Sequence, residues 1–176
     1  MMKAQKLLIT TLTIAALMGL QSLRAAYAGA GVGYMIDSEE ELFTAHVGFE
    51  VAAKGSLSHN MEFEIGYVED SEMGVDVEIM PLMLNYRAIN TVNESYDFYF
   101  GGGAGISKVD VSGFGLSDDD SVFTVQLMVG MDFKLSSEVA LRLGYRYIYL
   151  ETVELFGIEL DELDDSVVEL GLVVKF

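Results

Sequence analysis

The end of the chain alternates between apolar and mixed side chains, and this alternation constrains the fold more than any other feature. Reading backward from the last residue, every second side chain is apolar, giving the set Phe176, Val174, Leu172, Leu170 and Val168. The residues between them include the charged Glu169 and Lys175. Because successive side chains of a β-strand point to opposite faces, the segment predicts a strand with one apolar face and one mixed face.

The same period of two recurs in seven earlier segments. We expect strands near residues 30–36, 42–51, 60–68, 75–87, 96–108, 122–134 and 139–150, with the C-terminal strand as the eighth. In most of them one face is bulky and apolar, and the other carries glycines and charged residues. The fourth segment is less regular, because Val77 and Ile79 fall on the face opposite to Met80. A bulge near Pro81 would reconcile the two faces.

The direction of the apolar face decides the class of protein. A soluble barrel packs its apolar side chains inside, whereas these apolar faces are long enough for tilted strands to cross a bilayer. Eight strands enclose an interior barely wide enough for side chains, which suits glycines beside long charged residues. We therefore predict an all-β fold, an eight-stranded antiparallel up-and-down transmembrane β-barrel. A soluble β-sandwich is the alternative.

The N-terminus has the pattern of an export signal. Lys3 and Lys6 precede an apolar run from Leu7 to Leu20, and Ala26-Tyr27-Ala28 supplies an A-x-A cleavage pattern. We expect residues 1–28 to be a cleaved secretory signal peptide and residues 29–176 to form one barrel domain. Export and a membrane-spanning barrel together indicate the outer membrane of a Gram-negative-type bacterium.

The composition excludes several classes of function. The chain has no cysteine, which removes thiol catalysis and cysteine-bound zinc. Its formal net charge is −18, and loss of Lys3, Lys6 and Arg24 with the signal would leave −21. Such a surface repels nucleic acid, so we expect no nucleic-acid partner. We also expect no cofactor.

The acidic residues gather in alternate connections. The connections after the first, third, fifth and seventh strands, with their strand ends, hold 20 of the 28 acidic residues. The other three hold only Glu94 and Glu138. With both termini in the periplasm, the acidic set is extracellular. Asp118–Asp120 and Asp161–Asp165 offer oxygen ligands for Ca²⁺ or Mg²⁺, but neither matches an EF-hand, and we expect solvated loops.

His46 is the main candidate for chemistry inside the barrel. It lies on the inward face of the second strand, near Glu62 and Glu64 of the third, and a histidine beside carboxylates can act as an acid/base pair. Its inward neighbours include no serine, and the chain has no G-x-S-x-G elbow. We expect a lumenal histidine hydrogen-bonded to a carboxylate, with no catalytic role.

Two arginines predict charge pairs across the lumen. Counting through the connecting turns places Arg142 roughly opposite Asp132 and Arg146 roughly opposite Glu169. One interpretation is a charged constriction that selects ions. The other, which we favour because eight strands leave little bore, is a plug of salt bridges.

Three motifs carry a resemblance to a known family. They are Met80–Arg87 (MPLMLNYR), Phe100–Gly105 (FGGGAG) and Leu143–Tyr147 (LGYRY), and they precede the terminal Phe176. In this order they resemble the small bacterial outer-membrane β-barrel superfamily of opacity proteins and the transmembrane domain of outer membrane protein A. The resemblance implies Phe176 as an assembly signal, periplasmic chaperones and the barrel-assembly machinery as partners, and contact with outer-membrane lipids and lipopolysaccharide. It does not imply one activity.

The sequence therefore predicts a non-enzymatic outer-membrane barrel with a structural or surface-exposed role. Its lumen would be filled by side chains, and its extracellular loops would be acidic. Three alternatives stay open: a small nonspecific porin-like channel, a lipid-modifying enzyme of the outer membrane, and an adhesin whose extracellular partner is unknown.

Overall fold

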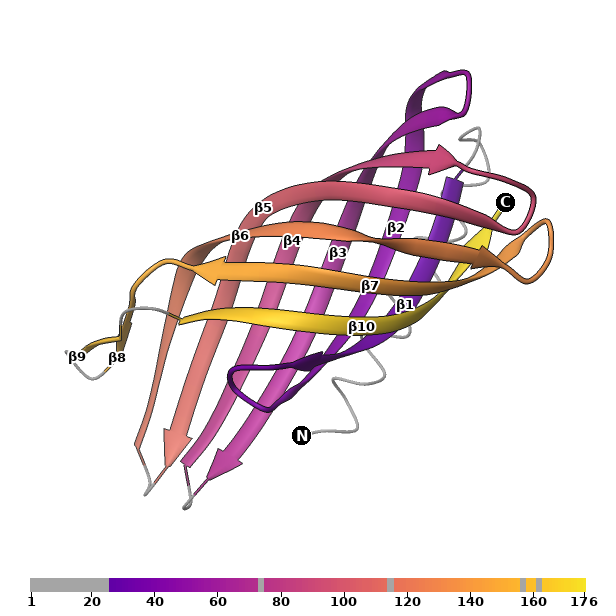
Figure 1. The fold of residues 1–176 in the computed structure, drawn as a ribbon. Helices are drawn as coiled ribbons and strands as arrows, with labels where there is room; N and C mark the ends of the chain where they lie inside the picture. The colour runs from indigo at the N-terminus through magenta and orange to yellow at the C-terminus, as the bar shows by residue number, and fades with distance from the viewer. Residues whose placement is uncertain (1–25, 73–74, 114–115, 156–157, 161–162) are drawn as a thin grey trace.

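A computed structural model describes residues 26–72, 75–113, 116–155, 158–160 and 163–176. These residues form ten strands, of which eight close into an antiparallel barrel in the order β1-β10-β7-β6-β5-β4-β3-β2 (Figure 1). The barrel strands are β1 (Ala26–Met35), β2 (Glu41–Lys54), β3 (Leu57–Glu72), β4 (Val75–Thr91), β5 (Tyr96–Gly113), β6 (Leu116–Lys134), β7 (Val139–Leu150) and β10 (Leu163–Lys175). Among the described residues, no helix is long and apolar enough to cross a membrane. The predicted fold class is confirmed.

The two ends of the chain close the barrel against each other. β1 pairs with β10 over nine residue pairs, from Tyr27 opposite Lys175 to Met35 opposite Val167. The backbone N–H of Phe176 then donates to the Ala26 carbonyl at 2.9 Å. Closure gives every strand of the barrel a hydrogen-bonded neighbour on both sides. We call the end of the barrel at Ala26 and Phe176 the terminal end, and we call the opposite end the hairpin end.

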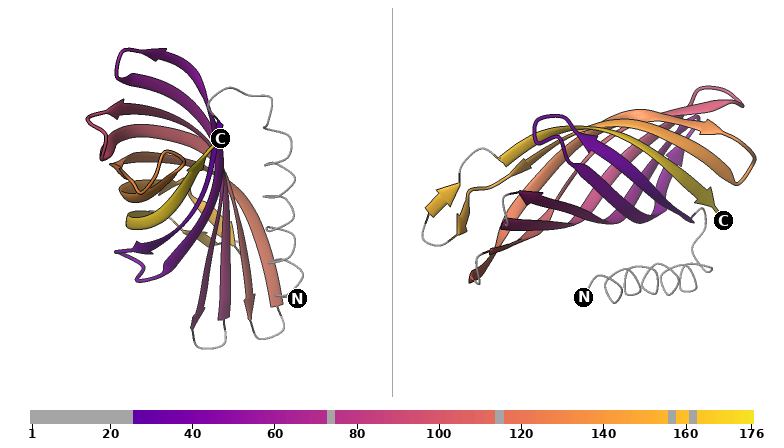
Figure 2. Two further views of the ribbon diagram at one scale, coloured as in Figure 1. Left: turned by 90° about the vertical axis from the view of Figure 1, so that its right-hand side faces the viewer. Right: turned by 90° about the horizontal axis from the view of Figure 1, so that it is seen from below.

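The barrel is much taller on one side than on the other. Strands β3 to β6 contain 16, 17, 18 and 19 residues, whereas the other four contain 10 to 14. Figure 1 and Figure 2 show these four strands reaching past the others at the hairpin end. A small two-stranded sheet, β8 (Val153–Leu155) and β9 (Ile158–Leu160), lies in the connection between β7 and β10. The sequence pattern missed both the extensions and this sheet.

The apolar face of each strand points outward, as the alternation predicts. Large apolar side chains from every barrel strand are roughly half exposed on the outer surface; examples are Tyr34, Phe43, Phe63, Leu82, Ile106, Phe123, Leu143 and Leu170. Their neighbours in sequence point inward, and most of these are buried. The outer wall is therefore an apolar belt around the barrel.

The predicted bulge near Pro81 is wrong. The β3–β4 register is the same on both sides of the proline, with Ile65 opposite Leu82 and Val68 opposite Ile79. Pro81 has no N–H to donate, so the β3–β4 hydrogen bonding is interrupted there without a change of register. The β2–β3 ladder does contain a register shift, between Glu50 and Ala52. The fourth strand looked irregular because some of its inward residues are apolar as well.

Those inward apolar residues belong to a cluster that fills the lumen at the hairpin end. We call it the apolar cap; its buried members are Met35, Leu42, Val68, Val109, Val122, Ile148, Leu150, Val153 and Val167, with Ile79 and Val111 packed against them. Every barrel strand contributes to it. A side chain in the cap is surrounded by protein, whereas one on the belt is surrounded by lipid once the barrel is in a membrane.

This difference predicts unequal costs for the same substitution. Leu42 in the cap is 2% exposed, and Leu127 on the belt is 68% exposed. Leu42→Ala should lower the free energy of unfolding by about 2–5 kcal/mol, because the rigid cap keeps the cavity. Leu127→Ala should lower the free energy of unfolding by less, because lipid chains move into the vacated space. Denaturant unfolding in lipid vesicles measures both, and equal losses would mean that the cap is not tightly packed.

Candidate functional site

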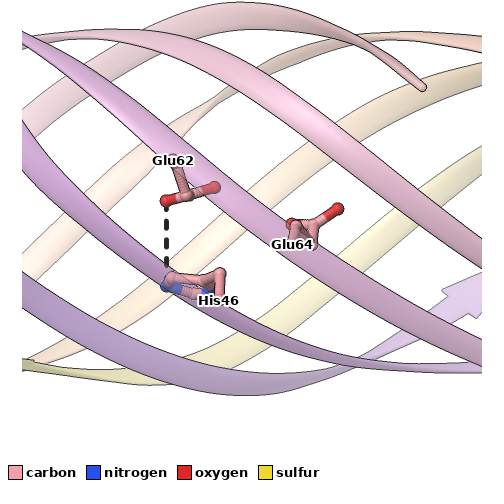
Figure 3. Close-up of side chains that lie close together, drawn as sticks. All are labelled: His46, Glu62 and Glu64. Atoms are coloured by element: carbon pink, nitrogen blue, oxygen red, sulfur yellow. Dashed lines mark ion pairs between the residues drawn. The ribbon is translucent and has the colours of Figure 1, made fainter. Parts of the chain in front are cut away.

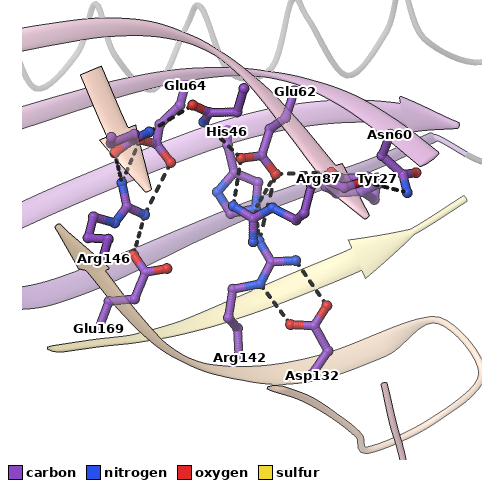
Figure 4. A network of polar contacts seen from close by, with 12 residues as sticks. Tyr27, His46, Asn60, Glu62, Glu64, Arg87, Asp132, Arg142, Arg146 and Glu169 are labelled. Atoms are coloured by element: carbon purple, nitrogen blue, oxygen red, sulfur yellow. Dashed lines mark hydrogen bonds and ion pairs between the residues drawn. The ribbon is translucent and has the colours of Figure 1, made fainter. Parts of the chain in front are cut away.

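A layer of buried polar side chains fills the lumen between the apolar cap and the terminal end. We call it the lumenal network; its members are Tyr27, His46, Glu62, Glu64, Asn85, Arg87, Tyr99, Gln126, Asp132, Arg142, Arg146 and Glu169, all at most 6% exposed. Figure 4 shows the arginines of this network beside their carboxylates. Seven of these are the site residues taken from the sequence pattern. The alternation along each strand points them inward, and closure of the barrel brings them together.

Arg142 and Asp132 form a two-point ion pair. The residues lie directly opposite each other on β7 and β6, as the turn counting predicts. Arg142 Nε donates to Asp132 Oδ1 at 2.7 Å, and its NH2 group donates to Oδ2 at 2.9 Å. Parallel bonds of this kind fix the plane of the guanidinium as well as its position.

Arg146 binds two carboxylates from different sides of the barrel. Its NH1 group donates to Glu64 Oε1 on β3 at 2.6 Å, and its NH2 group donates to Glu169 on β10. Arg146 and Glu169, expected roughly opposite each other, are two residues apart in register, because Arg146 pairs across the strand with Val167. The diagonal distance still lies within reach of the long side chains. The contact to Glu64 crosses the lumen between strands that are not neighbours.

Arg87, the last residue of the predicted fourth strand, was not among the predicted site residues, yet it belongs to the network. Arg87 is fully buried, and its NH2 group lies 2.8 Å from Glu62 Oε1. Its guanidinium carbon lies 4.5 Å from the centre of the Tyr99 ring, and that of Arg142 lies 4.9 Å from the same centre. Both guanidiniums therefore lie within cation–π distance of the Tyr99 ring. The alternation from the outward Tyr86 was the signal that could have placed Arg87 inside.

Glycines make room for these large side chains. Tyr99 lies opposite Gly130, and a Cβ at Gly130 would collide with the Tyr99 ring. A Cβ at Gly144 would meet the Tyr99 hydroxyl and the Glu169 carboxylate. Small residues on the inward face are thus the counterpart of the long charged ones, because an eight-stranded barrel has no spare volume.

His46, Glu62 and Glu64 come close enough to suggest a metal site, and their partners argue against one. Their nearest ligand atoms lie within 4.8 Å of one another, and His46 Nε2 lies 3.9 Å from Glu62 Oε2 (Figure 3). Arg87 already binds Glu62, and Arg146 binds Glu64. A divalent cation would have to displace these guanidiniums, so the donor set does not fit one.

His46 is hydrogen-bonded to a guanidinium and not to the expected carboxylate, since Glu62 is 3.9 Å away. Arg142 NH1 lies 3.2 Å from His46 Nε2. A guanidinium can only donate, so Nε2 is the acceptor and a neutral ring carries its proton on Nδ1. His46 is therefore held as a structural acceptor, with its lone pair directed at a cation.

The charges inside the barrel nearly balance. Three guanidiniums, those of Arg87, Arg142 and Arg146, meet four carboxylates in the lumenal network, which are Glu62, Glu64, Asp132 and Glu169. Near the terminal end, Asp97 is paired with Lys134 at 2.7 Å and with Lys175 at 3.2 Å. A small lumen tolerates so many ionised groups only because nearly every charge has an opposite one beside it.

The acidic candidates of the connections have different surroundings. Asp161 and Glu162 lie outside the described residues. Asp165 is 4% exposed and accepts from the backbone N–H groups of Asp37 and Ser38, so it fastens the β1–β2 turn. His59, expected in a turn, lies in β3 with its ring against Tyr86 on the outer face.

A row of four carboxylates crosses the outer wall at the hairpin end. Glu69 lies opposite Glu78, Glu78 opposite Asp110, and Asp110 opposite Asp119, across strands β3 to β6. We call this set the carboxylate row. Lys108 lies 2.9 Å from Asp110 and 3.5 Å from Asp119, and its hydrogen bond to Asp110 raises the Lys108 pKa. Like charges in direct cross-strand positions are destabilising, so the carboxylate row lowers the free energy of unfolding.

The buried ion pairs predict strong coupling between Arg146 and Glu169. Either Arg146→Ala or Glu169→Ala leaves a buried charge with fewer partners, at a cost of up to about 3–5 kcal/mol. Arg146→Ala should cost more, because it also deprives Glu64 of its cation. The double variant should lose less than the sum of the single losses in a cycle measured by denaturant unfolding in lipid vesicles.

The exposed pair of Lys108 and Asp110 is the control for this cycle. An exposed pair contributes about 0–1 kcal/mol, so the coupling between Lys108→Ala and Asp110→Ala should be small. Additive losses for Arg146 and Glu169 would contradict the contact between them.

Comparisons with known proteins agree with this architecture. The family model of the outer membrane protein β-barrel domain matches residues 9–176, whereas no curated protein sequence matches the chain. Among solved structures, the attachment invasion locus protein Ail of Yersinia pestis is 17% identical with a TM-score of 0.60, over 86% of this chain and 97% of Ail. The N-terminal barrel domain of OprF from Pseudomonas aeruginosa is 12% identical with a TM-score of 0.60, over 89% of this chain and 100% of that domain.

One similar structure is that of an enzyme. The outer membrane enzyme PagL is 10% identical with a TM-score of 0.53, over 84% of this chain and 98% of PagL. Identities this low show a shared fold and no shared activity. The resemblance inferred from the sequence motifs is confirmed. Because the family model matches nearly the whole chain, this protein belongs to the outer membrane protein β-barrel domain family.

Proposed function

We propose that the protein is a closed, non-enzymatic barrel of the outer membrane that has a structural or surface-exposed role. The observation that carries the proposal is the filling of the lumen by two successive layers. The apolar cap fills the hairpin end, and the lumenal network fills the space toward the terminal end. A solute would have to break buried ion pairs and then separate apolar side chains, which is the opposite of a water-filled pore.

The surroundings of the two histidines support a role without catalysis. His46 is engaged by Arg142, and the His59 ring is stacked on Tyr86 with its Nδ1 against the tyrosine hydroxyl. A lipid-modifying enzyme with a histidine base would need that histidine beside a nucleophile that lipid can reach. Both rings are committed to other partners.

The charge of the hairpin end supports a surface role of a particular kind. One solved structure of Ail is a complex with the heparin analogue sucrose octasulfate, which is a polyanion. In this chain the carboxylate row and Asp118–Asp120 give the hairpin end a negative charge. A polyanion would be repelled here, whereas cations or cationic partners would be attracted.

The family also supports the expected assembly route. We infer contact with outer-membrane lipids and lipopolysaccharide along the apolar belt, delivery by periplasmic chaperones, and insertion by the barrel-assembly machinery. Phe176 would be the assembly signal. Its side chain is on the outer surface, and its backbone closes the barrel against Ala26.

A closed lumen predicts the absence of stable conductance. The refolded protein should give no defined single-channel steps in planar lipid bilayers at moderate voltage, because both layers of the lumen stay packed. A porin-like channel reconstituted in the same lipid provides the positive control. Reproducible steps of one size from the pure protein would favour the alternative of a small pore.

The carboxylate row predicts that removal of one charge stabilises the barrel. Glu78→Gln should raise the free energy of unfolding by about 0.2–1 kcal/mol at low ionic strength, because Glu78 lies between Glu69 and Asp110. The gain should shrink in concentrated salt, which screens exposed charges. Glu94→Gln in the β4–β5 turn is the control and should have little effect. A loss of stability in Glu78→Gln, or equal effects of the two changes, would contradict repulsion along the row.

A further inference from the structure

The first three residues of β1 are built into the barrel. Ala26, Tyr27 and Ala28 are 1%, 4% and 7% exposed. Tyr27 pairs with Gly48 on one side and Lys175 on the other, and Ala28 pairs with Val47 and Val174. The A-x-A pattern that predicts removal of residues 1–28 therefore coincides with a strand segment that has neighbours on both sides.

Tyr27 is also part of the lumenal network. Its hydroxyl donates to Glu62 Oε2 at 3.0 Å, and its ring lies edge-on to His46 with 6.1 Å between the ring centroids. The ring covers Gly48 so closely that a Cβ there would collide with it. A chain without Tyr27 would have a cavity beside Gly48, and the fully buried Glu62 would lose one hydrogen-bond donor.

Loss of the same segment would open the barrel at its seam. Phe176 donates its backbone N–H to the Ala26 carbonyl, and Lys175 and Val174 lie opposite Tyr27 and Ala28. Without residues 26–28, the end of β10 would lose its β1 partners. An unpaired strand end inside a lipid bilayer is unfavourable, because no water is present to satisfy its backbone groups.

We infer that the export signal is removed by hydrolysis of the Ala25–Ala26 peptide bond, so that the mature chain begins at Ala26. Water adds across this bond, leaving a carboxylate on Ala25 and an amine on Ala26. Ala25 supplies the small residue before the scissile bond, whereas Leu23, two positions earlier, departs from the A-x-A pattern. The inference rests on the proposed outer-membrane location, because a chain that is not exported would keep its signal.

The test is N-terminal sequencing of the full-length gene product isolated from the outer-membrane fraction. The expected sequence is Ala-Tyr-Ala-Gly, and Gly-Ala-Gly-Val would overturn the inference and restore cleavage after Ala28. An intact Met1 would overturn it as well. Absence of the protein from the outer membrane would instead count against the proposed function, so the two failures are distinguishable.

Two variants separate the candidate bonds without depending on the stability of the barrel. Ala25→Leu should make unprocessed precursor accumulate, because a bulky residue then precedes the scissile bond. Ala28→Leu should leave the processing site unchanged. The reverse pattern would place the cleavage after Ala28.

Refolded chains provide a second, structural test. A chain that begins at Ala26 should unfold in lipid vesicles at a higher denaturant concentration than a chain that begins at Gly29. Within the chain that begins at Ala26, Tyr27→Phe should shift the midpoint less than Tyr27→Ala, because it keeps the ring over Gly48. Equal midpoints for the two chains would show that residues 26–28 do not contribute to the barrel, and the inference would fall.

Discussion

The pairing of buried guanidiniums with buried carboxylates is the interaction on which the rest of this barrel depends. Arg87, Arg142 and Arg146 are taken out of water together with four carboxylates, and each of these charges would be costly without its partners. The pairs connect strands on opposite sides of the lumen as well as neighbours. They therefore link the strands to one another from inside, with Tyr99 and the inward glycines packed around them.

The apolar cap fills the part of the lumen that the ion pairs leave open. A polar layer alone could admit water around its charges, whereas the cap replaces water with Leu42, Val153 and Val167 at the hairpin end. The two layers make the middle and the hairpin end of the lumen a packed core. Under the proposed function, other molecules meet the outer surface, where the apolar belt meets lipid and the taller β3–β6 side carries the carboxylate row.

Some of this could be predicted from the sequence, for reasons that are local. The pair of Arg142 and Asp132 was readable because only a short turn separates β6 from β7, so counting through it gives the register. The register of Arg146 against Glu169 was off by two, because the connection from β7 to β10 contains a small sheet of its own. The contact of Arg146 with Glu64 was not readable, because it joins strands that are not neighbours.

The sequence by itself determined that the chain forms outward-apolar strands, because a period of two is a property of the extended backbone and needs no knowledge of the partners. It also determined which residues face inward, His46 and Glu62 among them. Only the tertiary structure decided what those inward residues meet. Closure placed Arg87 on Glu62, gathered the apolar cap from all eight strands, and gave Tyr27 a place in the lumen. The physical reason is that contacts across a closed lumen depend on the shear and diameter of the barrel, which no single strand encodes.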